Sequence, residues 1–225
     1  MATTRQTRQT ADLAVFNYLH RGRLLLALLL GFATLVVMAA LAAPVDLSEP
    51  GDEPAFTGAE VTPPRALPAL ALARVDDTAW SSAETRGRLS LFFFGYTSCP
   101  DVCPLTLGRA RQLHAQLGAD AAQVDVYFIT VDPERDTRAR LGRYVSQFSP
   151  DFIALTGTAA ELEAARAAFG VIAVRQPHAT GTGYAVDHTA SSYLVDGEGR
   201  IRLIYPHDAP SEDVLAGLRA LLASE

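Results

Sequence analysis

Cys99 and Cys103 are the two cysteines of the chain, and they stand in Thr97-Ser-Cys-Pro-Asp-Val-Cys-Pro104. If the second cysteine lies in a first helical turn, both side chains face the same way. Their Cα atoms would then be about 6 Å apart, a separation that a disulfide tolerates. A helix N-terminus also lowers the pKa of a thiol, which makes a thiolate accessible near neutral pH. The pair therefore suits redox chemistry or the binding of a soft metal ion.

Three interpretations of the cysteine pair compete. A purely stabilising disulfide is disfavoured, because a bridge that closes so short a loop removes little entropy from the unfolded chain. A redox dithiol usually has the spacing C-x-x-C, and here one more residue separates the cysteines. Thioredoxins also carry a proline just before the strand that faces their cysteines, whereas Asp187-His-Thr-Ala-Ser-Ser-Tyr193 has none. A redox dithiol and a soft-metal site both remain open.

His188 lies in this last stretch, at the start of a strand that the expected fold brings against the cysteine loop. Two thiolates and one imidazole form a soft set of three ligands. Thiolate selects Cu(I), and imidazole also accommodates Cu(II). Zinc is chemically possible but would require a fourth ligand. Among the other histidines, His178 is the candidate for an auxiliary contact, because its loop leads toward His188.

The strands that must position these residues are recognisable as apolar runs. Buried strands are expected at Leu89–Phe94, directly before the cysteine segment, and at Val124–Val131. A short strand follows at Phe152–Leu155, and Ser192–Val195 pairs with Ile201–Tyr205 as a hairpin. With helices between them, the order predicts an α/β, thioredoxin-like fold with a central mixed sheet flanked by helices. The cysteines follow the carboxyl end of a strand, where such sheets bind ligands.

The helices are expected from apolar residues at helical spacing and from capping signals. One helix follows Cys103, a second is capped by Asp136 or Thr137, and Thr158 opens a third that ends near Gly170. Residues 171–188 predict a hairpin or a long loop, and a last helix begins near residue 211. The expected buried positions are Leu107, Ala110, Leu113, Leu117, Leu141, Tyr144, Val145, Phe148, Val214, Leu215, Leu218, Leu221 and Leu222.

An uncharged apolar run at residues 24–43 is long enough to span roughly 30 Å of hydrocarbon. Arginines precede it and acids follow it, so residues 1–23 are expected in the cytoplasm. We interpret the run as a transmembrane signal anchor, against the alternative of a signal peptide cleaved near Ala43. The prolines of 44–68 predict an extended linker, which leaves 69–225 as one domain. The expected location is the cytoplasmic (inner) membrane, single-pass, with this domain in the periplasm or extracytoplasmic space.

Composition excludes several classes of function. The chain of 225 residues has a net charge of −6, which disfavours nucleic acid as a partner. Two cysteines cannot build a disulfide-rich scaffold or a site of four thiolates. All 19 basic residues are arginines, so chemistry that depends on a lysine is excluded.

Four segments resemble the signatures of the Sco/SenC family of copper chaperones. The first, Phe93-Phe-Gly-Tyr-Thr-Ser-Cys-Pro-Asp-Val-Cys-Pro104, contains both cysteines, and the second is Val131-Asp-Pro-Glu-Arg-Asp-Thr137. The others are Phe152-Ile-Ala-Leu-Thr-Gly-Thr158 and Tyr184-Ala-Val-Asp-His-Thr189, the latter followed by Tyr193-Leu-Val-Asp196. They occur in the family's order and cover residues 89–225.

The resemblance implies a thioredoxin-like metallochaperone that inserts copper into the dinuclear copper centre of cytochrome c oxidase subunit II. Cys99, Cys103 and His188 fall on the family's copper ligands, for Cu(I), Cu(II) or both. Asp132 matches an acidic residue near that site, with a role beside the metal ligands or in redox chemistry as one hypothesis and turn geometry as the other. The apo subunit is the implied recipient, and a periplasmic copper donor and a thiol reductant are the further expected partners.

Two other activities fit the same residues. A thiol–disulfide reductase that prepares the cysteines of the oxidase subunit would use Cys99 as attacking thiol, and His188 would be largely dispensable. A peroxidase would need an arginine beside its cysteine. No arginine neighbours Cys99 in sequence, which leaves Arg135 as the candidate to approach it in space. The metallochaperone itself is not an enzyme, whereas the alternatives are.

Overall fold

The computed structural model describes residues 58–177 and 183–224, which belong to one compact unit. The predicted cytoplasmic segment 1–23, the predicted membrane span 24–43 and the first part of the predicted linker lie outside the described residues, as does His178. Among the described residues, no helix combines the length and the apolar character that crossing a bilayer requires.

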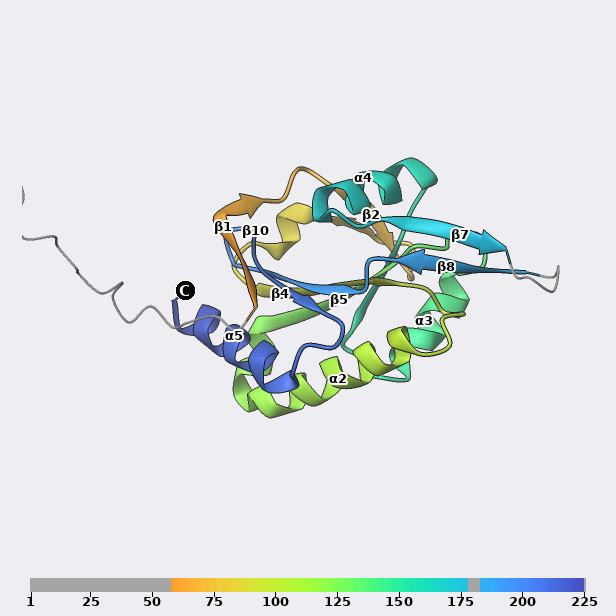
Figure 1. The fold of residues 1–225 in the computed structure, drawn as a ribbon. Helices are drawn as coiled ribbons and strands as arrows, with labels where there is room; N and C mark the ends of the chain where they lie inside the picture. Colours follow the sequence, from red (N-terminus) through yellow and green to blue (C-terminus); the bar gives the residue numbers. More distant parts are fainter. Residues whose placement is uncertain (1–57, 178–182, 225) are drawn as a thin grey trace, which may run out of the picture. The chain divides into compact units, whose positions relative to one another are not determined.

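A mixed sheet of eight strands forms the centre of the molecule, in the order β1-β10-β9-β4-β5-β6-β2-β3 (Figure 1). β4 is parallel to β5, β5 is parallel to β6, and β9 runs antiparallel to β4 on the other side. β4 is buried along its whole length, because helices cover both faces of the sheet and leave no position for a polar surface. The strands are β1 Ala59–Ala66, β2 Ala71–Arg74, β3 Ala79–Ser81, β4 Leu89–Gly95, β5 Val124–Thr130, β6 Ile153–Thr156, β9 Ser191–Val195 and β10 Arg200–Pro206.

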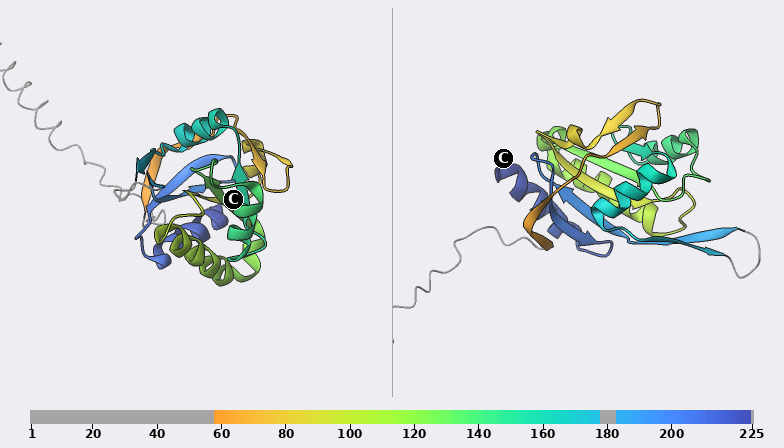
Figure 2. Two further views of the ribbon diagram at one scale, coloured as in Figure 1. Left: turned by 90° about the vertical axis from the view of Figure 1, so that its right-hand side faces the viewer. Right: turned by 90° about the horizontal axis from the view of Figure 1, so that it is seen from above.

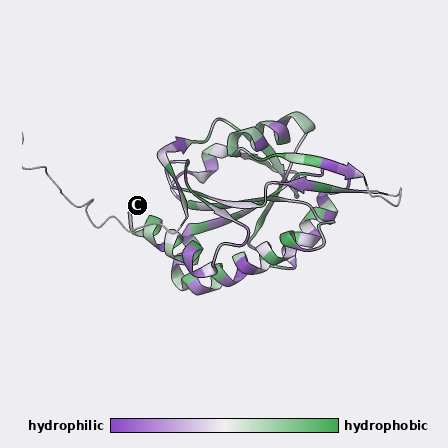
Figure 3. Cartoon of the chain, in the orientation of Figure 1, coloured by the Kyte–Doolittle hydropathy of each residue, from purple (hydrophilic) through white to green (hydrophobic). Residues whose placement is uncertain are grey.

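Two helices, α2 and α5, lie together on one side of the sheet, and α4 lies on the other (Figures 1 and 2). α2 alternates hydrophobic and hydrophilic residues along its length, as expected for a helix with one buried face (Figure 3). Thr137 caps α3, and Thr158 with Glu161 forms the capping box of α4, as predicted. The helices are α2 Val102–Leu117, α3 Arg138–Ser146, α4 Ala159–Phe169 and α5 Ser211–Ser224.

Residues 171–188 contain a hairpin, one of the two structures expected there. Its strands, β7 Ala173–Pro177 and β8 Tyr184–His188, pair with each other in a separate sheet of two strands. The hairpin extends beyond the end of the central sheet (Figures 1 and 2). The end of β8 that carries His188 lies next to the body of the domain, because β9 begins shortly afterwards.

The thioredoxin-like α/β prediction is confirmed, and one boundary differs from it. Residues 59–66, which fall in the predicted linker, form β1 and pair with β10 at the edge of the sheet. The linker prediction is wrong there, because a segment rich in proline can still form an edge strand. Pro63 and Pro64 are tolerated in an edge strand, where the ladder is interrupted between Glu60 and Arg65.

Candidate metal centre

The cysteine loop connects β4 to α2. Gly95 ends β4 and accepts a hydrogen bond from Val131 N at 2.8 Å. Cys99 N donates to the carbonyl of Tyr96 at 3.2 Å, and Cys103 follows in the first turn of α2. Both cysteines are free thiols, Cys99 half-buried and Cys103 buried. The loop thus presents one sulfur to solvent and holds the other against the core.

Asp136 anchors this loop from the segment after β5. Its carboxylate is 1% exposed and accepts hydrogen bonds from Thr97 N at 3.1 and 3.2 Å and from the Thr97 hydroxyl at 2.5 Å. The Thr130 hydroxyl donates to it at 2.7 Å. Sequence reasoning considered Asp136 only as a helix cap. The signal that was missed is its place after the carboxyl end of a strand that neighbours the cysteine strand.

The sulfur of Cys103 lies 3.8 Å from Nε2 of His188, although 85 residues separate the two in the chain. Nδ1 of His188 lies 3.1 Å from the carbonyl oxygen of Thr189. A carbonyl accepts only, so Nδ1 carries a proton in this contact, and Nε2 is the ring nitrogen that faces the cysteines. Cys103 N also donates to the Cys99 sulfur at 3.4 Å. The predicted approach of His188 to the cysteines is therefore confirmed.

The two thiols are electrostatically unequal. A hydrogen bond from the Cys103 thiol lowers the pKa of Cys99 to about 4; burial opposes this, and His188 and the Cys103 amide reinforce it. The pKa of Cys103 is raised, because its proton is held by Cys99 and because the thiol is buried. At neutral pH the pair consists of one thiolate, Cys99, and one thiol, Cys103.

Gly95 is required by the position of the Cys103 sulfur. A Cβ atom at residue 95 would fall 2.7 Å from that sulfur and 2.9 Å from the ring of Phe128. Such distances are below van der Waals contact, so any other residue would displace the thiol or the ring. Sequence reasoning treated Gly95 only as the end of a strand.

The donor set fits a soft metal ion after a small adjustment. In zinc sites, thiolate and imidazole ligands lie about 2.3 and 2.0 Å from the ion, which puts sulfur and nitrogen about 3.5–3.7 Å apart at tetrahedral to trigonal angles. The separation of Cys103 and His188 is close to this range. Within the described ranges, no three His, Cys, Asp or Glu side chains are already spaced as ligands of one ion. The three donor atoms would therefore have to move slightly to surround one ion.

Asp132 is fully buried, and its carboxylate is held by Arg135 and by the Tyr184 hydroxyl, the latter at 2.7 Å. These partners place it beside β8 and not against the thiols. Arg135, the candidate for a peroxidase arginine, is engaged by Asp132 and by the carbonyl of Tyr184 at 2.7 Å. Two of its guanidinium nitrogens are thus directed to Asp132 and to Tyr184.

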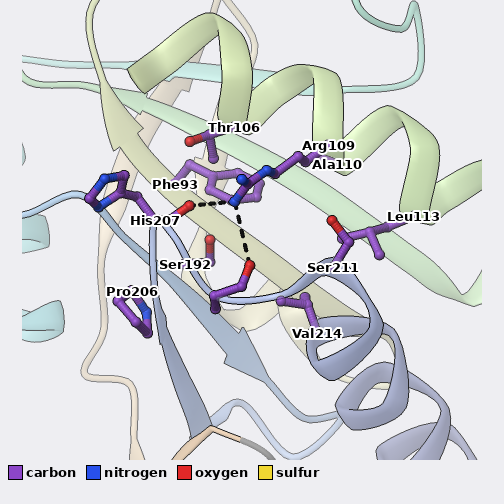
Figure 4. Close-up of a pocket in the computed structure, with 11 residues that line it drawn as sticks. Phe93, Thr106, Arg109, Ala110, Leu113, Ser192, Pro206, His207, Ser211 and Val214 are labelled. Atoms are coloured by element: carbon purple, nitrogen blue, oxygen red, sulfur yellow. Dashed lines mark hydrogen bonds between the residues drawn. The ribbon is translucent and has the colours of Figure 1, made fainter. Parts of the chain in front are cut away.

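A hollow lies between α2 and the segment that leads from β10 into α5 (Figure 4). Arg109 reaches across it and donates to the carbonyl of His207 at 2.6 Å and to that of Ala209 at 3.4 Å (Figure 4). The side chains of Phe93 and Leu113 line it. Arg109 thus ties α2 to the loop before α5, and His207 lies here and not with the cysteines.

Comparison with known proteins gives consistent matches. The SCO1/SenC family model matches residues 63–223. An SCO2-like protein of Rickettsia prowazekii is 34% identical over 137 residues, which cover 60% of this chain and 67% of the relative. Bradyrhizobium japonicum ScoI, solved with copper bound, is 35% identical with a TM-score of 0.63, over 69% of this chain and 99% of that structure. BsSco, described as a member of the Sco family of cytochrome c oxidase assembly proteins, shares the fold at 22% identity and a TM-score of 0.58, over 72% of this chain and 96% of that structure.

Proposed function

The chain belongs to the SCO1/SenC family, and from this premise we propose that it is a membrane-tethered copper metallochaperone. It binds copper through Cys99, Cys103 and His188 and delivers it to the dinuclear copper centre of cytochrome c oxidase subunit II. The copper is cargo, not a resident cofactor. Copper binding by ScoI and the assembly role stated for BsSco support the proposal.

The observation that carries the proposal is the contact between Cys103 and His188, at 3.8 Å. A disulfide oxidoreductase needs its two sulfurs and no imidazole at this place. Thiolate and imidazole together are a ligand set for copper in both of its common oxidation states. The hydrogen bond of Nδ1 to Thr189 favours the tautomer in which Nε2 is the ligand atom.

The unequal exposure of the ligands supports release as well as binding. Cys99 is half-buried at the surface of its loop, whereas Cys103 is buried under it. An incoming ligand of the recipient reaches the ion from the Cys99 side. We expect Cys99 to be the first protein ligand that is replaced, and Cys103 the last.

The surface around the site supports handover to a protein. Among the described residues, the large hydrophobic side chains that are exposed are Leu105, Ile172 and Val174. Leu105 lies on the first turns of α2 after Cys103, and Ile172 exchanges hydrogen bonds with Thr189, next to His188. A recipient that brings its ligands to Cys99 would cover these side chains, which fits the apolar centre of a protein interface.

Copper titration of the reduced full-length protein tests the ligand assignment. X-ray absorption of the loaded protein should report two sulfur ligands and one nitrogen. Replacement of Cys99 or Cys103 by Ser, or of His188 by Ala, should each abolish tight binding. His207→Ala is the matched control, because His207 lies away from the cysteines, and it should bind like the parent. Unchanged binding by His188→Ala would refute the assignment of the third ligand.

The alternative is a thiol–disulfide reductase acting on the oxidase subunit, and the low pKa of the half-buried Cys99 beside a buried Cys103 is the observation that favours it. The same variants separate the two functions. A reductase would still reduce a disulfide of subunit II after His188→Ala, and it would lose this activity after Cys99→Ser. A chaperone would lose copper transfer in both variants.

A further inference from the structure

The strand that carries His188 has no place in the central sheet. β8 pairs only with β7 among the described strands, with Ala173 opposite His188. An isolated hairpin of two strands is marginally stable in water, so its own ladder does not fix its position. Side-chain contacts with the body of the domain must therefore hold β8, and with it the imidazole.

The first of these contacts comes from Asp132, directly after β5. The Asp132 side chain is 0% exposed. The backbone amide of Asp132 donates to the Thr130 hydroxyl at 3.0 Å. One carboxylate oxygen accepts from the Tyr184 hydroxyl at 2.7 Å, and the other accepts from Nε of Arg135. A buried charge is costly unless it is paired and hydrogen-bonded, so the two partners are confined to this geometry.

Arg135 holds the first residue of β8 in two further ways. Its Nη1 donates to the carbonyl of Tyr184 at 2.7 Å, and its guanidinium lies over the Tyr184 ring at 3.8 Å from the centroid. The planar guanidinium can form the ion pair, the hydrogen bond and the stack together, which an ammonium group cannot do. Arg135 thus joins the buried acid to the start of β8.

Tyr96 connects the same cluster to both halves of the metal centre. Arg135 lies 5.5 Å from the centre of its ring, and its hydroxyl accepts from Val186 N in the middle of β8 at 3.3 Å. The ring meets the imidazole of His188 edge to face, at 5.9 Å and 81°. The carbonyl of Tyr96 accepts the Cys99 amide. The contacts run from Asp132 to the histidine and the cysteine loop.

We infer that Asp132, Arg135 and Tyr184 form a latch that sets the position of His188 opposite the thiols. The latch holds Tyr184, the first residue of β8. Tyr96 supports the middle of this strand, and His188 is its last residue. Arg135 is therefore a positioning residue for the imidazole ligand. The inference rests on the proposed function only where copper is named as the ion.

Arg135→Lys tests the latch, because it keeps the charge beside Asp132 and removes the fork and the stack. Tyr184→Phe removes one hydrogen bond and keeps the ring. We expect Arg135→Lys to weaken copper affinity about tenfold to hundredfold and to reduce the nitrogen contribution to the X-ray absorption of the copper-loaded full-length protein. Tyr184→Phe should also lower the copper affinity and the nitrogen contribution, each by less than Arg135→Lys does.

Arg200→Lys is the matched control. Arg200 pairs with Asp196, another buried acid, in the turn between β9 and β10. This variant should lose stability without a change in affinity or in the copper spectrum. A folded Arg135→Lys protein with the parent's affinity and nitrogen signal would overturn the latch.

Hydrogen exchange of the metal-free protein separates the latch from the proposed function. Arg135→Lys should speed exchange of the β8 amides about tenfold or more, while the amides of β4 exchange as in the parent. If the parent does not bind copper through His188, the proposed function fails, and the exchange result decides the latch alone. Equal acceleration in β4 and β8 would mean that Arg135 stabilises the whole domain and would refute the latch.

Discussion

At the scale of single residues, the site depends on an asymmetry between two thiols that the sequence places symmetrically. Each cysteine directly precedes a proline, and nothing in their spacing distinguishes them. The fold leaves Cys99 half-buried and puts Cys103 under the loop, where the core removes it from water. Cys103 therefore keeps its proton and donates to Cys99, which becomes the nucleophile and the accessible ligand.

Alkylation rates should reveal this asymmetry. In the reduced, metal-free protein, Cys99 should react with iodoacetamide well before Cys103 at neutral pH. Because the pKa of Cys99 is lowered to about 4, its reactivity should persist as the pH falls and disappear only as the pH passes below that value. Mass spectrometry of the modified peptides measures both rates. Faster modification of Cys103 would contradict the assignment.

Gly95 offers a second test at this scale. Gly95→Ala adds a methyl group 2.7 Å from the Cys103 sulfur, so we expect a destabilisation of about 1–3 kcal/mol and weaker copper binding. Gly108→Ala, inside α2, is the control, because no heavy atom lies within 4 Å of the added methyl group. It should stabilise the helix by up to about 1 kcal/mol and leave copper binding unchanged. Denaturant titration and copper titration give the two readouts.

At the scale of elements, buried aspartates fasten the loops to the sheet. Asp136 holds the cysteine loop, and Asp132 holds the start of β8. Asp196 plays the equivalent part in the turn between β9 and β10, where it accepts from the amides of Glu198 and Arg200 and from the side chains of Arg200 and Arg202. Each acid compensates backbone or arginine donors that a turn would otherwise leave unpaired.

Asp196 should make the stability of the domain sensitive to acid. Burial acts to raise its pKa, but the hydrogen bonds from Arg200 and Arg202 outweigh burial and lower it. A carboxylate whose pKa is lower in the folded than in the unfolded state stabilises the fold above the unfolded value, and the contribution is lost as the pH falls through the folded value. The stability difference between the parent and Asp196→Asn should therefore shrink below about pH 4. Urea unfolding across this range measures it, and a difference that does not change with pH would contradict the prediction.

At the scale of the whole molecule, two of the exposed large hydrophobic residues in the described part of the chain lie on segments that adjoin the site. Leu105 and Ile172 come from α2 and from the chain just before β7, and the approach of His188 to Cys103 brings these segments together. Replacing both by Ser should slow copper transfer to apo-subunit II while affinity and stability stay near those of the parent. The loss should come from the encounter with the recipient, because neither side chain is a ligand.

The transfer experiment needs a control variant in which a serine is introduced on the surface away from the cysteines. Ala115→Ser lies on the exposed side of α2, toward the end of the helix away from Cys103, and should transfer copper at the parental rate. Transfer is followed by the spectrum of the dinuclear centre. Parental rates for Leu105→Ser with Ile172→Ser would remove this surface from the proposed handover.

The sequence by itself predicted most of the elements and the donor types that the candidate site offers. Apolar runs and capping residues predicted β4, β5, the hairpin of β9 and β10, and α2 to α5, because burial and helix ends depend on neighbours in the chain. The closeness of His188 to the cysteines followed from the order of the elements. The same local signals misjudged residues 59–66, since pairing with β10 depends on a strand more than a hundred residues away.

Only the tertiary structure decided how these groups are held and how they differ. The inequality of the two thiols, the space that Gly95 leaves for sulfur and the partners of Asp132, Arg135 and Asp136 all arise from contacts between distant segments. Burial and hydrogen bonding set a pKa or the position of an imidazole, and both are properties of packing that no local pattern contains. Residue types supplied the candidate ligands, and the fold decided their charges and their exposure.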